Sequence, residues 1–281
     1  MIKTTSMREF MKTQVTGWDK PDAVLKFSEG NSKLDGIFTF SIPAGHSCPY
    51  AKACLSKTVL SDKNPCGFGI QDGKDTKWRC FTATDESKYP ATRNQRWFNF
   101  LTLLEQKNIT GLVKLLERSI PVSKWGAPIR IHVSGDFFNQ LYFDAWLMIA
   151  DMHPNQIFYA YTKALPEWVN RLNVIPKNFI LTASYGGTHD HLIARHDLRF
   201  AVVVFSVAEA SKLGLEIDHD DSHAYTNSGN FALLLHGTQP AGTPAAVAWS
   251  TLKKAGIGGY NSQKTKRVAV RSKVGAVPMP A

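Results

Sequence analysis

The sequence contains no uninterrupted apolar run of about eighteen residues, the length that a transmembrane helix requires. Its first residues, MIKTTSMREFMK, lack the apolar segment that forms the centre of a secretory signal peptide. There is also no low-complexity tract and no exact internal repeat. We therefore expect a cytoplasmic globular protein that does not contact a membrane.

Acidic residues are scarce. The chain has 23 Asp and Glu against 33 Lys and Arg, which gives a formal net charge of +10. A surplus of this size favours an anionic partner, most often nucleic acid, although a basic protein without such a partner is the alternative. The last segment, residues 251–281, contains no acid at all. It is expected to be either an arm that binds phosphates or a solvated terminus.

Cysteine is absent after residue 80. The four cysteines lie in one loop-rich block, separated by five, eleven and thirteen residues. Because a cytoplasmic protein rarely keeps structural disulfides, clustered thiols indicate a metal site. The spacing contains no paired CxxC, so zinc, a [4Fe-4S] cluster and four unrelated buried cysteines all stay open. We predict zinc, with iron–sulfur as the alternative, bound by Cys48, Cys54, Cys66 and Cys80.

The chain changes character near residue 125, which predicts an N-terminal region 1–125, a core 126–250 and a basic tail 251–281. In the core, short apolar strands alternate with helical segments, and strand starts recur every ~20–30 residues, as in a parallel sheet. The expected strands are 129–133, 157–161, 179–183, 201–205 and 231–235, and the expected helices are 141–152, 166–172, 189–196 and 207–213. An earlier strand, 37–40, and a helix, 97–104, extend the series.

No GxGxxG motif follows any of these strands, which disfavours a dinucleotide-binding Rossmann domain. We therefore predict an α/β fold of the (β/α) type, a TIM-barrel-like or partial barrel, with an N-terminal Cys-rich metal-binding segment.

In such folds the loops after the carboxyl ends of the strands line one mouth, and active sites are found there. Asp136 directly follows an expected strand, so it is either a site residue or the cap of the next helix, and one residue can do both. The strand ends are small, polar and glycine-rich: Ser134-Gly135-Asp136, Thr162-Lys163, Ser184-Tyr185-Gly186-Gly187, Ser206 and His236-Gly237-Thr238.

Residues near these ends suit a nucleotide-like substrate. Glycines allow backbone N–H groups to approach an anion, and aromatic rings offer faces on which a base stacks, although core packing is the alternative for the rings. The candidate substrate-binding residues are Phe137, Tyr161, Lys163, Tyr185, Gly186, Gly187 and His236.

The segment GLEIDHDDSHA, residues 214–224, concentrates acids and histidines. Such density suits a metal, a nucleophile with an acid–base partner, or simply a polar loop. The candidate catalytic carboxylates are therefore Asp136, Asp218, Asp220 and Asp221.

Four stretches, SIPAGHSCPYAKAC, IRIHVSGDFF, FYAYTKALPEWV and IPKNFILTASYGG, taken in order, resemble bacteriophage proteins of the gene product 88 type over about residues 37–190. That family looks distantly similar to radical-SAM TIM barrels. The resemblance implies a phage origin, and hence the host cytoplasm, with a barrel-like fold and a cysteine-bound cofactor. A radical-SAM cluster is normally held by CxxxCxxC, which leaves one iron for S-adenosylmethionine. Here the first pair is CPYAKAC, and no CxxC follows it.

A second family is similar in chemistry: transglycosylases that exchange guanine for a 7-deazaguanine are TIM barrels with a cysteine-bound zinc, and phages use DNA-acting versions to evade restriction. They need an aspartate nucleophile and a second carboxylate, which Asp136 and the Asp218–Asp221 cluster could supply. Their zinc ligands usually lie late in the chain, whereas here they lie early.

We therefore predict a phage-type DNA guanine transglycosylase, with DNA and a 7-deazaguanine base as its partners. A radical-SAM-like iron–sulfur enzyme acting on nucleotides or nucleic acid is the first alternative, and a non-catalytic basic DNA-binding protein is the second. The sequence leaves the oligomeric state open.

Overall fold

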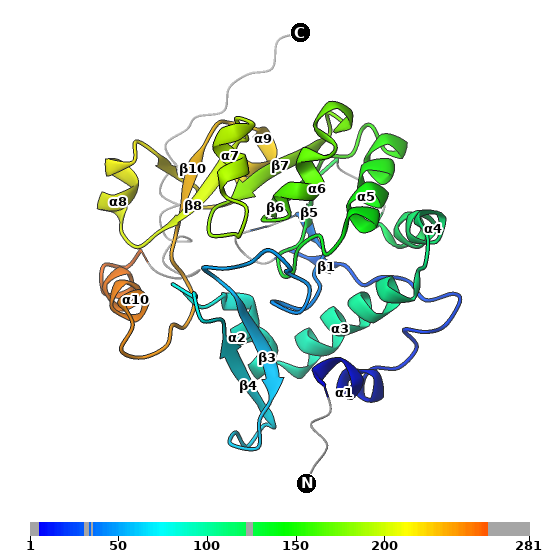
Figure 1. Ribbon diagram of the computed structural model, residues 1–281, viewed down its shortest axis with the longest axis horizontal. Coiled ribbons are helices and arrows are strands. Elements are labelled where there is room, and N and C mark those ends of the chain that lie inside the picture. Colours follow the sequence, from blue (N-terminus) through cyan, green and yellow to red (C-terminus); the bar gives the residue numbers. More distant parts are fainter. Residues whose placement is uncertain (1–5, 31–33, 35, 122–125, 258–281) are drawn as a thin grey trace.

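The computed structural model describes residues 6–30, 34, 36–121 and 126–257. Within them the chain forms an eight-stranded mixed sheet, flanked by helices, and a separate hairpin (Figure 1). The strand order is β1-β2-β5-β6-β7-β8-β10-β9, and every pair is parallel except β1 with β2. The sheet strands are β1 Ser28–Glu29, β2 Phe38–Thr39, β5 Ile129–Ile131, β6 Phe158–Thr162, β7 Phe179–Ser184, β8 Phe200–Val204, β9 Glu216–Ile217 and β10 Phe231–Leu234.

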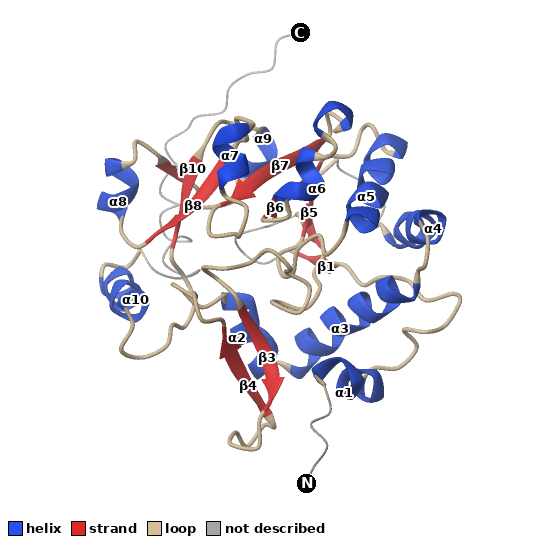
Figure 2. Cartoon of the chain, in the orientation of Figure 1, coloured by secondary structure: helices blue, strands red, loops and turns tan. Residues whose placement is uncertain are grey.

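The helices lie mainly around the outside of the sheet, and the hairpin lies with α2 below it in the view of Figure 2. The hairpin pairs β3 (Ser56–Leu60) with β4 (Phe68–Asp72). The helices are α1 Met7–Gln14, α2 Phe81–Lys88, α3 Pro90–Glu105, α4 Ile109–Ser119, α5 Gln140–Met152, α6 Leu165–Val169, α7 His191–Arg195, α8 Val207–Lys212, α9 Ser222–Thr226 and α10 Pro244–Lys254, with a short 3-10 turn at Leu172–Val174.

The predicted alternation of strands and helices in the core is confirmed. All five strands and the four helices between them are present, with ends within about three residues of the expected ones. The earlier strand and helix correspond to β2 and α3. Parallel strands covered on both faces are nearly continuous apolar runs, which explains why the sequence marks them clearly.

A closed TIM barrel is not formed by the described residues. Their sheet is open, with β1 and β9 as its edges. It is nevertheless concave, because residues from five of its strands line a single pocket: Arg130, Tyr161, Ser184, Val203 and Leu233. The opposite face packs against the outer helices through the main hydrophobic core, which includes Ile129, Ile131, Phe158 and Trp146.

The predicted division at residue 125 separates β1 and β2 from the strand with which β2 pairs, β5. The boundary at residue 250 falls inside α10, and residues 258–281 of the predicted basic tail lie outside the described residues. None of the helices in the described part of the chain combines the length and hydropathy that a membrane crossing requires.

Candidate functional site

A pocket lies where the N-terminal segment crosses the carboxyl ends of the parallel strands. The strands contribute residues at their ends, from Ser134 to Asp136, Lys163, Ser184 and His236. The N-terminal segment contributes the other wall: Cys48, Ala51, Cys54, Trp78, Arg79, Cys80, Phe81 and Thr82. The strand ends that the sequence singles out therefore line a pocket together with the N-terminal segment.

The end of β5 shows why this edge is built from unusual residues. His132 has a left-handed backbone (φ 63°) and ends the strand, and Gly135 follows with φ 86°. A Cβ on Gly135 would meet the Ile42 side chain at 2.3 Å and Ser47 Oγ at 2.6 Å. Only glycine therefore lets the N-terminal segment approach the strand end this closely.

The four cysteines separate into a group of three and one outlier. Cys48, Cys54 and Cys80 line the pocket. Cys66 is exposed at the end of the β3–β4 hairpin, where its thiol lies near the carbonyl oxygens of Phe68 and Ser87. The structure thus brings together three of the four predicted ligands, and the fourth lies elsewhere.

The thiols in the pocket are electrostatically coupled. Burial raises the pKa of Cys48 well above its usual value, and the negative charges of Asp136 and Cys80 raise it further. Burial also raises the pKa of Cys80, with Cys54 as the next largest cause. Among the described residues, no group of three or more His, Cys, Asp or Glu side chains is arranged to hold a metal ion.

Asp136 is 5% exposed and lies in the pocket wall. Its Oδ1 accepts hydrogen bonds from the Phe137 N–H (2.8 Å) and the Thr162 hydroxyl (2.6 Å), and its Oδ2 accepts one from the Lys163 N–H (2.8 Å). Burial raises the pKa of Asp136 to about 6, against these hydrogen bonds, which lower it. Both oxygens are engaged in joining the ends of β5 and β6, so Asp136 has a structural role whatever else it does.

The other three candidate carboxylates lie behind the pocket wall rather than in it. Asp221 forms an ion pair with Arg130 (2.5 Å) and accepts a hydrogen bond from the Tyr159 hydroxyl (3.1 Å). Asp218 accepts hydrogen bonds from the Tyr161 hydroxyl (3.4 Å) and from the Asp220 N–H (3.1 Å). Their influence on the pocket therefore passes through Arg130 and Tyr161, which do line it.

The predicted substrate-binding residues divide in the same way. Tyr161, Lys163 and His236 line the pocket. Phe137 is fully buried among outer-face aromatic rings, including Phe143 at 4.9 Å between centroids, and Tyr185 packs edge-on against Phe200. The position of Phe137 in the core gives it no ring face in the pocket.

The glycine loop after β7 holds the cysteine segment. The N–H groups of Gly186 and Gly187, predicted to face an anion, donate to the Asp190 carboxylate (both 2.9 Å). The Gly186 carbonyl oxygen accepts the N–H groups of Lys52 (3.1 Å) and Ala53 (2.8 Å). The loop thus fixes the backbone immediately before Cys54.

Gly186→Ala is expected to destabilise the protein by roughly 2–4 kcal/mol, because φ is +99° and a Cβ would meet Ala53 Cβ at 2.9 Å and Trp78 at 3.0 Å. Gly214→Ala is the matched control, since φ is +66° but no atom lies within 4 Å. We expect a loss of about 1 kcal/mol there. Urea denaturation measures both, and equal losses would show that the close approach at Gly186 does not matter.

A buried ion pair joins three of the segments around the pocket. Glu86 on α2 is fully buried, and its Oε1 accepts hydrogen bonds from Arg96 (2.9 Å), the Ala44 N–H (2.9 Å) and the Ser134 hydroxyl (3.1 Å). Burial raises the pKa of Glu86, while Arg96 lowers it. This carboxylate fixes the segment before Cys48 to the end of β5.

Several pocket residues were not among the candidates. Arg130 had a usable signal, because it is the polar residue between Ile129 and Ile131 and so points to the other face of the strand. Trp78 and Arg79 had none, since they lie in a loop whose position depends on contacts with distant segments. Arg79 forms an ion pair with Asp72, and its N–H donates to Gln239 Oε1 (2.7 Å).

The fold and pocket define a mixed α/β protein with a pocket at the carboxyl edge of a mostly parallel sheet. The chain belongs to the Gene product 88 family, whose model matches residues 19–267. This confirms the predicted bacteriophage-type family. No curated protein and no solved structure matches the chain.

Proposed function

We propose that the chain is a radical-SAM-like enzyme that acts on nucleotides or nucleic acid, and that Cys48, Cys54 and Cys80 hold a [4Fe-4S] cluster in the pocket at the strand ends. The observation that carries this proposal is the position of three cysteines in one pocket at the carboxyl ends of the strands, with the fourth outside it. Three thiolates on a four-iron cluster leave one iron open, whereas four close the site, as in structural zinc centres.

The donor types suit such a group. Three neighbouring, half-buried thiols can all ionise only if positive charge compensates them, and metal binding supplies that charge. No side-chain group among the described residues is arranged around a single ion. A four-iron cluster is larger, since each thiolate binds a different iron, so its ligands stand farther apart than those of one zinc ion.

When bound, such a cluster supplies an electron for the cleavage of S-adenosylmethionine. The chain itself supplies the enclosure and the binding surface. Trp78, Phe81 and Tyr161 line the pocket and offer aromatic faces of the kind on which a base stacks. Val203 and Leu233 form an apolar floor on the concave face of the sheet, which limits the access of water.

The guanine transglycosylase is the second candidate, and the observation that favours it is the carboxyl group of Asp136 in the pocket. In that reading Asp136 is the nucleophile, zinc replaces the cluster and a 7-deazaguanine is exchanged into DNA. Two features count against it. Both oxygens of Asp136 already accept hydrogen bonds. The zinc site of a transglycosylase would need all four cysteines, but Cys66 lies apart from the other three.

The deciding experiment is anaerobic reconstitution with iron and sulfide, followed by metal analysis and a visible spectrum. We expect about four irons per chain, a brown colour with absorbance near ~400 nm, and cleavage of S-adenosylmethionine after reduction by dithionite. Near-stoichiometric zinc without colour, together with exchanged bases in treated DNA, would instead support the transglycosylase. If the protein binds DNA but holds no metal and changes no base, the result would support the non-catalytic DNA-binding protein.

A further inference from the structure

Lys163 is an unusual cation, because it is buried in the pocket wall without a carboxylate partner. The residue is 9% exposed and lines the same pocket as the three cysteines. Its Nζ donates a hydrogen bond to the Ser184 hydroxyl at 2.6 Å. Among the described residues, no carboxylate forms an ion pair with this ammonium group.

The surroundings explain how the ammonium group is held. Lys163 directly follows β6 and Ser184 is the last residue of β7, so the two adjacent strand ends fix the side chain. The carboxylate nearest to Lys163 in the hydrogen-bond network is Asp136, which binds the Lys163 backbone N–H. The charge of Lys163 also lowers the pKa of Asp136, so the two charges attract each other without forming an ion pair. Asp190 is occupied by the N–H groups of Gly186 and Gly187.

A buried ammonium group is costly unless an anion compensates it, and a neutral hydroxyl compensates it only in part. Of the other charged residues in the pocket lining, Arg79 and Arg130 already have carboxylate partners, Asp72 and Asp221. Lys163 differs from these two arginines because its ammonium group forms no direct ion pair with a carboxylate of the described residues. An anionic group of a ligand can therefore pair with it.

We infer that Lys163 and Ser184 form an oxyanion-binding subsite for the ligand of this pocket, which takes a phosphate or carboxylate group. The inference deepens the proposed function and rests on it for the identity of the ligand, since a nucleotide brings a phosphate and S-adenosylmethionine brings a carboxylate. A lysine binds either group as a point charge, and the serine hydroxyl adds a directed hydrogen bond.

The test compares Lys163→Met with the unsubstituted protein in thermal unfolding, without iron, so that its outcome does not depend on the cluster. The probes are inorganic phosphate, guanosine monophosphate and methionine. Lys163→Met is expected to raise the unfolding temperature of the protein without ligand by a few degrees, because it removes a buried charge that Asp136 and the Ser184 hydroxyl compensate only in part. It should also abolish the stabilisation that the best probe gives to the unsubstituted protein.

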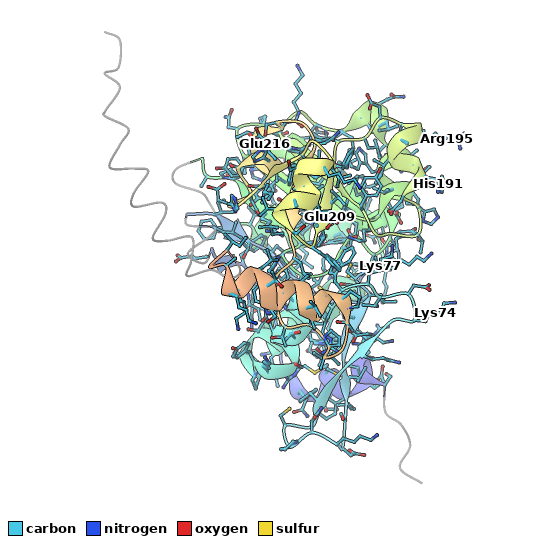
Figure 3. All side chains as sticks on the ribbon, turned by 90° about the vertical axis from the view of Figure 1, so that its left-hand side faces the viewer. Lys74, Lys77, His191, Arg195, Glu209 and Glu216 are labelled. Carbon is cyan, nitrogen blue, oxygen red and sulfur yellow. The ribbon has the colours of Figure 1, made fainter. Side chains whose placement is uncertain are left out.

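Lys74→Met is the matched control, because Lys74 is exposed and its side chain points away from the body of the protein, as Figure 3 shows. We expect this variant to keep the full response to the probe. Stabilisation by phosphate and the nucleotide identifies a phosphate ligand, and stabilisation by methionine identifies a carboxylate. The inference is overturned if no probe stabilises the unsubstituted protein, or if Lys163→Met keeps the response. If iron reconstitution fails but Lys163→Met still loses the response to the probe, the proposed cluster is refuted and the subsite is supported.

Discussion

Cys54→Ser is expected to abolish iron binding, whereas Cys66→Ser keeps the full complement. Cys54 lines the pocket with Cys48 and Cys80, so its loss leaves two thiolates, too few to hold four irons. Cys66 is exposed on the hairpin and contacts only carbonyl oxygens, so serine there removes no ligand. Iron and sulfide analysis of anaerobically reconstituted protein, with the absorbance near ~400 nm, measures the difference.

The same pair of variants distinguishes the two metals. A structural zinc held by four cysteines requires both residues, so both variants would then lose metal. Loss of iron from Cys66→Ser would contradict the three-cysteine site directly. Circular dichroism of both variants checks that each is folded before its metal content is compared, since Cys54 lies in a closely packed segment and Cys66 does not.

Arg96→Met is expected to destabilise the protein by about 3–5 kcal/mol, because it leaves the fully buried carboxylate of Glu86 without its counter-ion. It also removes the hydrogen bond from Arg96 to the Thr82 carbonyl oxygen (2.9 Å). Chemical denaturation at neutral pH measures the loss. A change below about 1 kcal/mol would contradict the importance that we assign to this ion pair.

The loss should depend on pH in a defined direction. Burial already raises the pKa of Glu86, and removing Arg96, which lowers it, raises it further. The folded state then binds the proton more tightly than the unfolded state, so the variant loses stability as pH rises through the folded pKa. Its deficit should therefore be smallest near pH ~4 and largest at neutral pH. The double variant Glu86→Gln/Arg96→Met has no such carboxyl group, and its deficit should not follow this titration.

The core of the fold could be predicted from the sequence because its strands are local. A run such as FAVVV at β8 is apolar over its whole length, and the helices between such runs have the expected spacing. The β3–β4 hairpin was not predicted, because its strands are only partly buried and carry no clear alternation. The sequence also did not reveal that the sheet stays open. Closure requires the two edge strands, β1 and β9, to pair with each other, and no single strand shows whether they do.

The part of the site that lies at the strand ends could be predicted from the sequence. Asp136, Tyr161, Lys163 and His236 lie in the pocket because they occupy or follow the carboxyl ends of parallel strands of one sheet. The assignment of Phe137 to the pocket failed because its ring packs into the outer-face core with Ile129 and Ile131, against Phe143, and not at the mouth. The separation of Cys66 from the other cysteines depends on the hairpin, which the sequence did not reveal.

The hydrogen bond between Arg79 and Gln239 has a consequence for the order in which the protein is made. The two residues are 160 positions apart, and Arg79 immediately precedes Cys80. During synthesis on the ribosome, the wall that carries Cys80 is therefore held at first by nearer contacts alone, such as those of Arg79 with Asp72 and of the Cys80 N–H with Ser56, until β10 and the loop after it have emerged. The pocket is therefore complete only after the loop that follows β10 has been translated, so the cofactor that we propose would be loaded late in synthesis.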